Sequence, residues 1–154
     1  VPRHLYDKRP SYYLIAGLCF TVLSEDYLKS EYGKTWMCKA PIRFVKQCLY
    51  GKKTSADEQV VVLNQILSHH VNHGYNEDTF APRRLFAVNG KKITNIHKLV
   101  RVVESATSKF LTFDLSDDAS IVMRRNLAFD SNKEIQDAHS IEHLKSVDLR
   151  TDCD

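Results

Sequence analysis

The sequence predicts an α+β fold in which short strands and hairpins outnumber helices. Residues 12–20 are almost continuously apolar and too short for an ordinary helix, and the valine run 60–62 is poor helix material. Asn89-Gly90 is the strongest two-residue signal for a hairpin turn. A continuously apolar strand is buried on both faces, so residues 12–20 are expected at the centre of the fold.

Length and composition favour a single domain. The chain has 154 residues, of which 43% are hydrophobic and 27% charged, and no apolar run approaches the roughly 20 residues that span a membrane. The net charge is +3, and the basic residues form scattered doublets that are typical of solvated turns. Neither nucleic acid nor a membrane is therefore expected as a partner. The start Val1-Pro2-Arg3, without Met, predicts a fragment of a longer protein.

The cysteines predict the redox environment. Cys19, Cys38, Cys48 and Cys153 show no C-x-x-C spacing, and Cys19 lies inside the apolar stretch. This pattern favours free thiols over a disulfide framework. We therefore expect an intracellular location in a reducing compartment or organelle.

The first third of the chain predicts a linker, a strand, a short helix and an ambiguous segment. Residues 1–11 are polar and basic and predict an incoming linker, and the strand that follows runs to about Leu23. Gly17 inside it marks a bulge, a bend or a close backbone approach. Ser24 caps a short helix that ends at Gly33. Residues 36–50 predict irregular structure, with either a short strand at 42–45 or a helix at 45–49.

The remaining segments predict a loop, further strands and the best helix of the chain. Residues 51–57 predict a loop, 59–67 a strand, 69–82 a polar excursion, and 84–88 a strand that turns at Asn89-Gly90 and returns through 91–93. Thr94 or Asn95 caps a helix whose apolar positions follow the i, i+3, i+4, i+7 rule: Ile96, Leu99, Val100, Val103 and Ala106.

The last third predicts a hairpin and an amphipathic tail. Residues 109–115 alternate as a strand, 119–125 pair back with it, and 127–145 predict one or two docked helices. The expected organisation is a linker at 1–11, a domain at 12–125 and a C-terminal helical extension at 126–154.

Several motifs resemble those of PDZ domains. The segment Ala16-Gly17-Leu18-Cys19-Phe20 resembles their carboxylate loop and strand, and Val88-Asn89-Gly90-x-x-Ile93, followed by a helix, resembles the second half of their signature. Residues 10–24, residues 58–67 and the segment Val71-Asn72-x-Gly74-Tyr75 resemble the second PDZ domain of plant-type Deg (HtrA-family) serine proteases. The resemblance covers about residues 5–125.

The resemblance implies a PDZ-like, partly open β-barrel or sandwich of five to seven strands with two or more helices and a helical tail. It also implies a peptide groove, in which backbone N–H groups near residues 15–18 hold a carboxylate and the edge at 18–20 pairs with the ligand. His97 occupies the place of a ligand-binding histidine, with a capping or solvent-facing role as the alternative, and Lys8 and Arg9 precede the loop. The candidate peptide- or partner-binding residues are Tyr13, Leu14, Ile15, Ala16, Gly17, Leu18, Cys19, Phe20, Ile96, His97, Val100 and Val103.

Departures from the family pattern shape the functional expectation. The usual small-Gly-Leu-x-x-Gly-Asp segment is replaced by the longer residues 69–82, and the Gly-x-Ser-Gly-Gly nucleophile loop of serine proteases is absent. We therefore expect no catalytic residues and no enzyme activity in this fragment of a serine endopeptidase. The resemblance implies docking onto other PDZ or protease domains and homo-oligomer assembly, and the alternative is recruitment of substrates by their C-termini.

One histidine cluster raises the question of a metal. His69 and His73 would share a face of a helix, with His70 between them. The segment follows a strand, offers no cysteine or acidic ligand at usable spacing, and is not required to carry histidine by the family pattern. The sequence therefore predicts no metal site and no cofactor.

Overall fold

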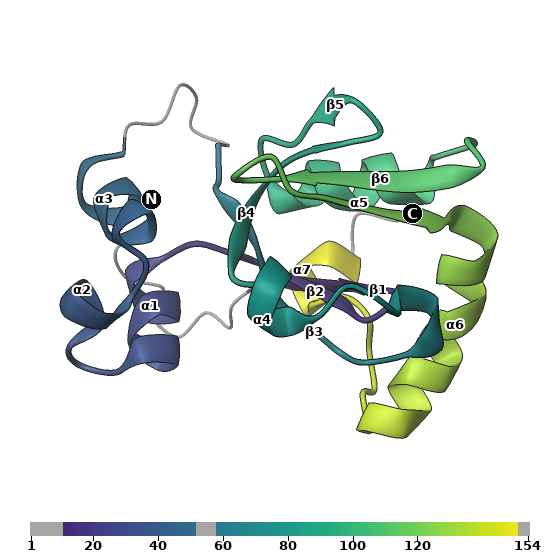
Figure 1. Ribbon diagram of the computed structural model, residues 1–154, viewed down its shortest axis with the longest axis horizontal. Helices are drawn as coiled ribbons and strands as arrows, with labels where there is room; N and C mark the ends of the chain where they lie inside the picture. Colours follow the sequence, from purple (N-terminus) through teal and green to yellow (C-terminus); the bar gives the residue numbers. More distant parts are fainter. Residues whose placement is uncertain (1–10, 52–57, 151–154) are drawn as a thin grey trace.

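Seven strands form one antiparallel sheet in the computed structural model, which describes residues 11–51 and 58–150. The strand order is β1-β2-β3-β4-β6-β7, with β5 paired to β4, so β1 and β7 stand at opposite ends of an open sheet (Figure 1). The predicted α+β class is confirmed. The strands are β1 (Tyr12–Ile15), β2 (Leu18–Val22), β3 (Val61–Ile66), β4 (Arg83–Val88), β5 (Lys91–Lys92), β6 (Phe110–Leu115) and β7 (Ser120–Arg124).

The helices lie in distinct places around this sheet. The first three helices, α1 to α3, form a lobe of residues 25–50 at the left of Figure 1, and α6 stands at the opposite side. We call residues 25–50 the helical lobe. Among the described residues, no helix is long and apolar enough to cross a membrane. The helices are α1 (Glu25–Tyr32), α2 (Trp36–Lys39), α3 (Ile42–Tyr50), the 3₁₀ turn η1 (His70–Asn72), α4 (Glu77–Phe80), α5 (Ile96–Glu104), α6 (Arg125–His139) and α7 (Val147–Arg150).

The prediction of one continuous strand through residues 12–23 is wrong, because the segment folds into a hairpin. Ile15 lies opposite Leu18, which leaves a two-residue turn at Ala16 and Gly17 with φ angles of 51° and 84°. Positive φ at both central residues matches the right-handed twist of the flanking strands. The expected close approach at Gly17 is confirmed, because a Cβ there would lie 2.4 Å from the carbonyl oxygen of Leu67.

The valine run at residues 60–62 does not alternate with polar residues, because the strand is covered on both faces. Val61 and Leu63 belong to the main core, between the sheet and α5, whereas Val60 and Val62 belong to a second core beneath the helical lobe. Successive side chains of a strand point to opposite faces. A strand that separates two cores therefore needs apolar residues without alternation.

The helical lobe contains both confirmed and corrected predictions. Ser24 caps α1 by accepting from the N–H of Tyr27 at 3.1 Å, and Gly33 ends this helix as expected. The alternative of a strand at residues 42–45 is wrong, because these residues begin α3. Pro41 immediately precedes that helix, where its missing N–H costs nothing.

Polar contacts join the helical lobe to the sheet. Arg43 of α3 and Arg83 of β4 both bind the carboxylate of Asp117, which lies in the turn between β6 and β7. The hydrogen bond from Arg43 is the main reason why the pKa of Asp117 is lowered from its ordinary value. The hydroxyl of Tyr27 on α1 also reaches the sheet and donates to Asn64 of β3 at 2.8 Å.

The second half of the chain largely follows the sequence. The turn at Asn89-Gly90, the strand at β3 and the hairpin of β6 and β7 are confirmed, and Asn95 caps α5 by accepting from the N–H of Lys98 at 2.8 Å. α6 confirms a docked tail helix. The polar excursion contains the short η1 and α4. The predictions for residues 1–10, residues 52–57 and Cys153 lie outside the described residues.

Replacing Gly17 with Ala should destabilise the protein far more than the same change at Gly33. Both glycines have positive φ, at 84° and 76°, but an added Cβ meets backbone and Asn72 only at Gly17. The backbone strain costs about 1–2 kcal/mol at either position, and overpacking adds about 1–3 kcal/mol at Gly17. Urea unfolding of both variants measures the difference, and equal losses would contradict the close approach.

Candidate partner site

Both edges of β2 are occupied by neighbouring strands. β1 pairs with one edge, with Leu14 opposite Cys19, and β3 pairs with the other, with Leu18 opposite Ile66. The expectation of a free edge at residues 18–20 is therefore wrong. The tight hairpin is the physical reason, because a two-residue turn returns β2 directly alongside β1.

The outer edge of β1 is also occupied, by a segment near the end of the chain. The N–H of Leu14 donates to the carbonyl of Leu144 at 2.8 Å, and the N–H of Ser146 donates to the carbonyl of Tyr12 at 3.1 Å. Tyr13 and Lys145 form the antiparallel bridge between these bonds. We call residues 144–146 the tail strand.

Side chains also fasten the tail strand and the residues that follow it. Lys145 pairs with Glu104 at the end of α5 at 2.8 Å, and Leu149 of α7 is buried in the main core. Asp148 accepts hydrogen bonds from Ser11 and Ser146. Burial would raise the pKa of Asp148, but these hydrogen bonds and the charge of His97 outweigh it and hold the pKa below its ordinary value.

Two buried asparagines bind the hairpin turn. Asn132 of α6 accepts from the N–H of Ala16 at 2.8 Å. Asn72 of η1 donates to the carbonyls of Ala16 and Leu67, both at 2.9 Å. We call Asn72 and Asn132 the asparagine clamp. The N–H of Ala16, which was expected to face a ligand carboxylate, is thus used inside the fold.

The opposite end of the sheet is covered by the polar excursion. The hydroxyl of Tyr75 donates to the carbonyl of Val122 and accepts from its N–H, each at 3.1 Å. A single side chain thereby satisfies the outward backbone groups of one residue in the middle of β7. Such a contact blocks continuous pairing of another strand at this edge.

Comparison with known sequences identifies the family. A sequence profile of the PDZ domain matches residues 1–148. The chain belongs to the PDZ domain family. It is 30% identical over 149 residues to Protease Do-like 2, chloroplastic, of Arabidopsis thaliana. These matched residues cover 97% of this chain and 24% of the relative.

A second Arabidopsis thaliana relative gives the same result. Protease Do-like 4, mitochondrial, is 30% identical over 150 residues, which cover 97% of this chain and 26% of the relative. The expected relation of this PDZ domain to plant Deg-type proteases is confirmed. The chain spans about a quarter of the length of the curated relatives that it matches.

The PDZ domain brings the predicted site residues together but buries most of them. α5 lies against β1 and β2, as the resemblance implied. The apolar stripe of this helix belongs to the main core, and of the predicted residues only Cys19 and His97 are half-buried. Their role in partner binding stays a prediction. The buried members include Tyr13, Leu14, Ile15, Ala16, Leu18, Phe20, Ile96, Val100 and Val103.

Cys19 does not supply a reactive thiol to this site. Burial, together with the charges of Glu31 and Glu77, raises the pKa of Cys19 to about 11. The thiolate is the nucleophilic form of cysteine, and it is scarce at neutral pH when the pKa is this high. Cys19 therefore acts as a small, half-buried apolar side chain.

Sequence reasoning missed the asparagine clamp and the tail strand. Asn72 stands in the quoted Val71-Asn72-x-Gly74-Tyr75 motif, so the resemblance could have marked it. Asn132 and residues 144–146 carry no local signal, because their partners lie more than a hundred positions earlier in the chain.

The two asparagines of the clamp should respond differently to replacement by Asp. In Asn72→Asp, the donor that serves two carbonyls is lost and a carboxylate faces them, which should cost about 3 kcal/mol at pH 7. Asn132→Asp keeps an acceptor for the N–H of Ala16 and should cost about 1 kcal/mol. Urea unfolding measures both.

The loss of folding stability in Asn72→Asp should depend on pH. A buried carboxylate that faces carbonyls has a folded-state pKa above its unfolded value of about 3.9. The part of the penalty that comes from the buried charge is therefore largest at high pH, and it disappears as pH falls below that unfolded value. The opposite trend, or a larger loss in Asn132→Asp, would contradict the assigned donor and acceptor roles.

Proposed function

We propose that this PDZ domain is a non-catalytic docking module of a Deg-type serine protease. It binds a PDZ or protease domain of a neighbouring subunit and so helps to assemble an oligomer that regulates proteolysis. The relatives are named as proteases and extend well beyond the region matched here, which supports a multidomain parent with serine endopeptidase activity. The relatives are named as chloroplastic and mitochondrial, which supports one of these organelles as the compartment.

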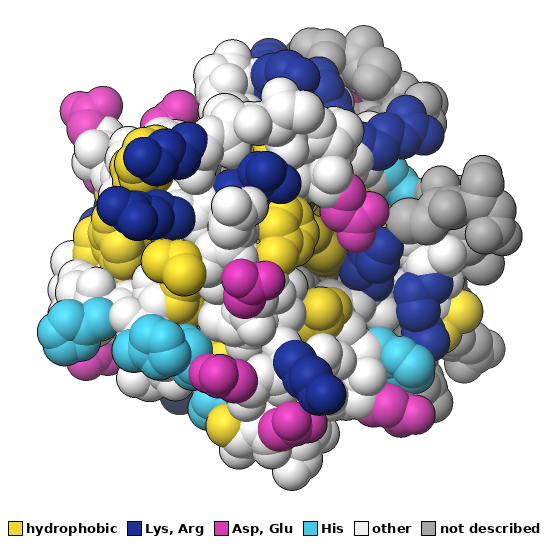
Figure 2. Space-filling view, turned by 90° about the vertical axis from the view of Figure 1, so that its right-hand side faces the viewer, with side chains coloured by type: hydrophobic (Ala, Val, Ile, Leu, Met, Phe, Trp, Pro, Cys, Tyr) yellow, Lys and Arg dark blue, Asp and Glu magenta, His cyan; other side chains and the backbone are white. Residues whose placement is uncertain are grey.

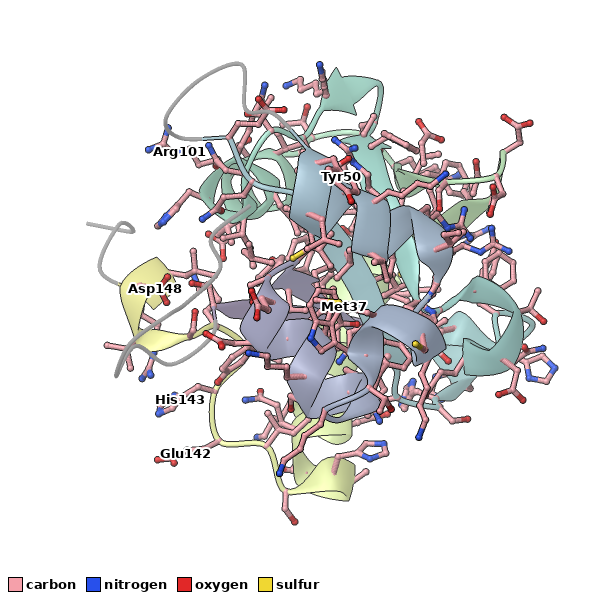
Figure 3. All side chains as sticks on the ribbon, turned by 90° about the vertical axis from the view of Figure 1, so that its left-hand side faces the viewer. Met37, Tyr50, Arg101, Glu142, His143 and Asp148 are labelled. Carbon is pink, nitrogen blue, oxygen red and sulfur yellow. The ribbon has the colours of Figure 1, made fainter. Side chains whose placement is uncertain are left out.

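The observation that carries this proposal is an exposed apolar face on the helical lobe. Met37, Ile42 and Tyr50 are 56%, 71% and 76% exposed. Figure 3 looks onto this side and shows Met37 and Tyr50 on α2 and α3, at the surface toward the viewer. Large apolar and aromatic side chains of this kind form the centres of protein interfaces.

The charged residues near this apolar face indicate what kind of partner surface would fit it. Residues 36–50 contain Lys39, Arg43 and Lys46 and no acidic residue. Lys39 and Lys46 are exposed on the same two helices as the apolar side chains. A complementary surface has an apolar centre and an acidic rim, because charge complementarity steers association and excludes wrong partners.

The closed sheet edges favour docking over recruitment of substrate C-termini. A peptide that adds as a strand needs free backbone groups at a sheet edge. β1 covers β2, the tail strand covers β1, and the asparagine clamp binds the turn. An outside peptide would have to displace residues of the domain itself.

Aspartate at Ile42 or Tyr50 should weaken assembly of the full-length protein without unfolding it. Each side chain is exposed, so the folding free energy should change by less than about 0.5 kcal/mol. A buried charge at the centre of an interface should cost at least about 2 kcal/mol, or about 30-fold in association. Sedimentation velocity measures the oligomer, and thermal unfolding checks the fold.

Val147→Asp is the matched control for this experiment, because Val147 is 62% exposed but lies on α7, outside the helical lobe. This variant should assemble like the parent. Unchanged assembly of both Ile42→Asp and Tyr50→Asp would contradict docking through the lobe.

The chain alone should bind C-terminal peptides no tighter than about 100 μM, which is around −5.5 kcal/mol. The closed edges are the reason. Fluorescence anisotropy with a library of C-terminal peptides tests this, with amidated peptides as controls. Low-micromolar binding that disappears on amidation would favour substrate recruitment and refute the docking proposal.

A further inference from the structure

We propose that His69, His70 and Glu134 form a binding site for a divalent transition metal such as Zn²⁺. One potential ligand atom from each residue lies within 4.8 Å of the others. His69 Nε2 is 2.8 Å from Glu134 Oε2, and the rings of His69 and His70 have centroids 4.0 Å apart. The fold thus supplies the acidic ligand that the sequence around the histidines lacks.

The ligand types fit the chemistry of zinc. Two imidazoles and one carboxylate are a common protein ligand set for Zn²⁺, with water completing the coordination. Metal–ligand bonds of about 2.0–2.2 Å place tetrahedral donors roughly 3.4 Å apart. His70 and Glu134 are exposed, so their side chains can move the short distance needed without repacking the core.

The backbone beneath these ligands is fixed on both sides. The N–H of His69 donates to Asn72 Oδ1 at 3.1 Å, and Asn72 is part of the asparagine clamp. Glu134 lies on α6, two positions after Asn132, the other half of that clamp. The contact between η1 and α6 therefore holds the two ligand-bearing segments in place before a metal arrives.

The site opens to solvent. His69 also lines a pocket of about 470 Å³ between the end of β3, η1 and α4. Figure 2 views the side of the molecule that carries α6 and shows histidine side chains at the surface, some at its lower left and others at its right. A metal ion can reach these side chains directly from water.

The hydrogen bonds that His69 already makes should lower the affinity of the site for Zn²⁺. Its Nδ1 accepts from the N–H of Val71 at 3.2 Å, so its Nε2 carries the proton and donates to Glu134. Metal at Nε2 moves the ring proton to Nδ1, and the bond from Val71 is lost. This loss should weaken binding roughly five-fold. We therefore expect a micromolar rather than a nanomolar site.

His73 distinguishes this site from a general affinity of histidines for zinc. It belongs to the same sequence cluster and lines the pocket, but it is not part of the ligand group. His73→Ala is therefore the matched control for His70→Ala. Glu134→Gln removes the carboxylate charge and keeps the shape of the side chain. His69 is left intact because its backbone and ring cap η1.

Isothermal titration of the untagged chain with ZnCl₂ tests the proposal. We expect one Zn²⁺ per chain with a dissociation constant on the order of 10 μM and, at 100 times that concentration, a rise in melting temperature of about 5–10 °C. His70→Ala and Glu134→Gln should each weaken binding at least ten-fold, and His73→Ala should not. Wild-type binding weaker than about 100 μM, or an equal loss in His73→Ala, would overturn the proposal.

Discussion

The two-residue turn at Ala16 and Gly17 is the constraint on which the rest of the fold depends. It places β1 alongside β2, and it is bound by Asn72 from η1 and Asn132 from α6. Both side chains are buried, so their amides need these partners as much as the turn needs them. Segments from three distant parts of the sequence are thereby held at one point, which also brings Glu134 beside the histidines.

Local signals in the sequence were sufficient to predict most helices, strands and turns, but not to predict which distant segments pack or pair with one another. The caps at Ser24 and Asn95 and the turn at Asn89-Gly90 depend on residues a few positions apart, and each appears where expected. The hairpin at residues 12–22 was missed because both of its strands are buried, which removes the alternation that separates two strands from one. The partners of the candidate site were missed because pairing between distant segments leaves no periodic trace.

The PDZ scaffold shows how the same fold can present different surfaces. β1 pairs with the edge of β2, the tail strand pairs with the edge of β1, and Tyr75 binds the edge of β7. The helical lobe, in contrast, exposes apolar side chains that a core would normally bury. The lobe is possible because β3 carries apolar residues on both faces. The proposed docking would rely on these exposed side chains, which require a shaped partner, rather than on backbone groups, which any extended peptide can match.

Closure of β1 by the tail strand has a consequence for how the protein is made. The contact between Tyr12 and Ser146 spans 134 positions, so it belongs to the non-local pairings that slow folding. During synthesis β1 leaves the ribosome long before the segment that covers it. In that interval its outer backbone groups form an unprotected strand edge, the kind that recruits other chains into aggregates. The exposure of that edge therefore ends only after residues 144–146 have been synthesised.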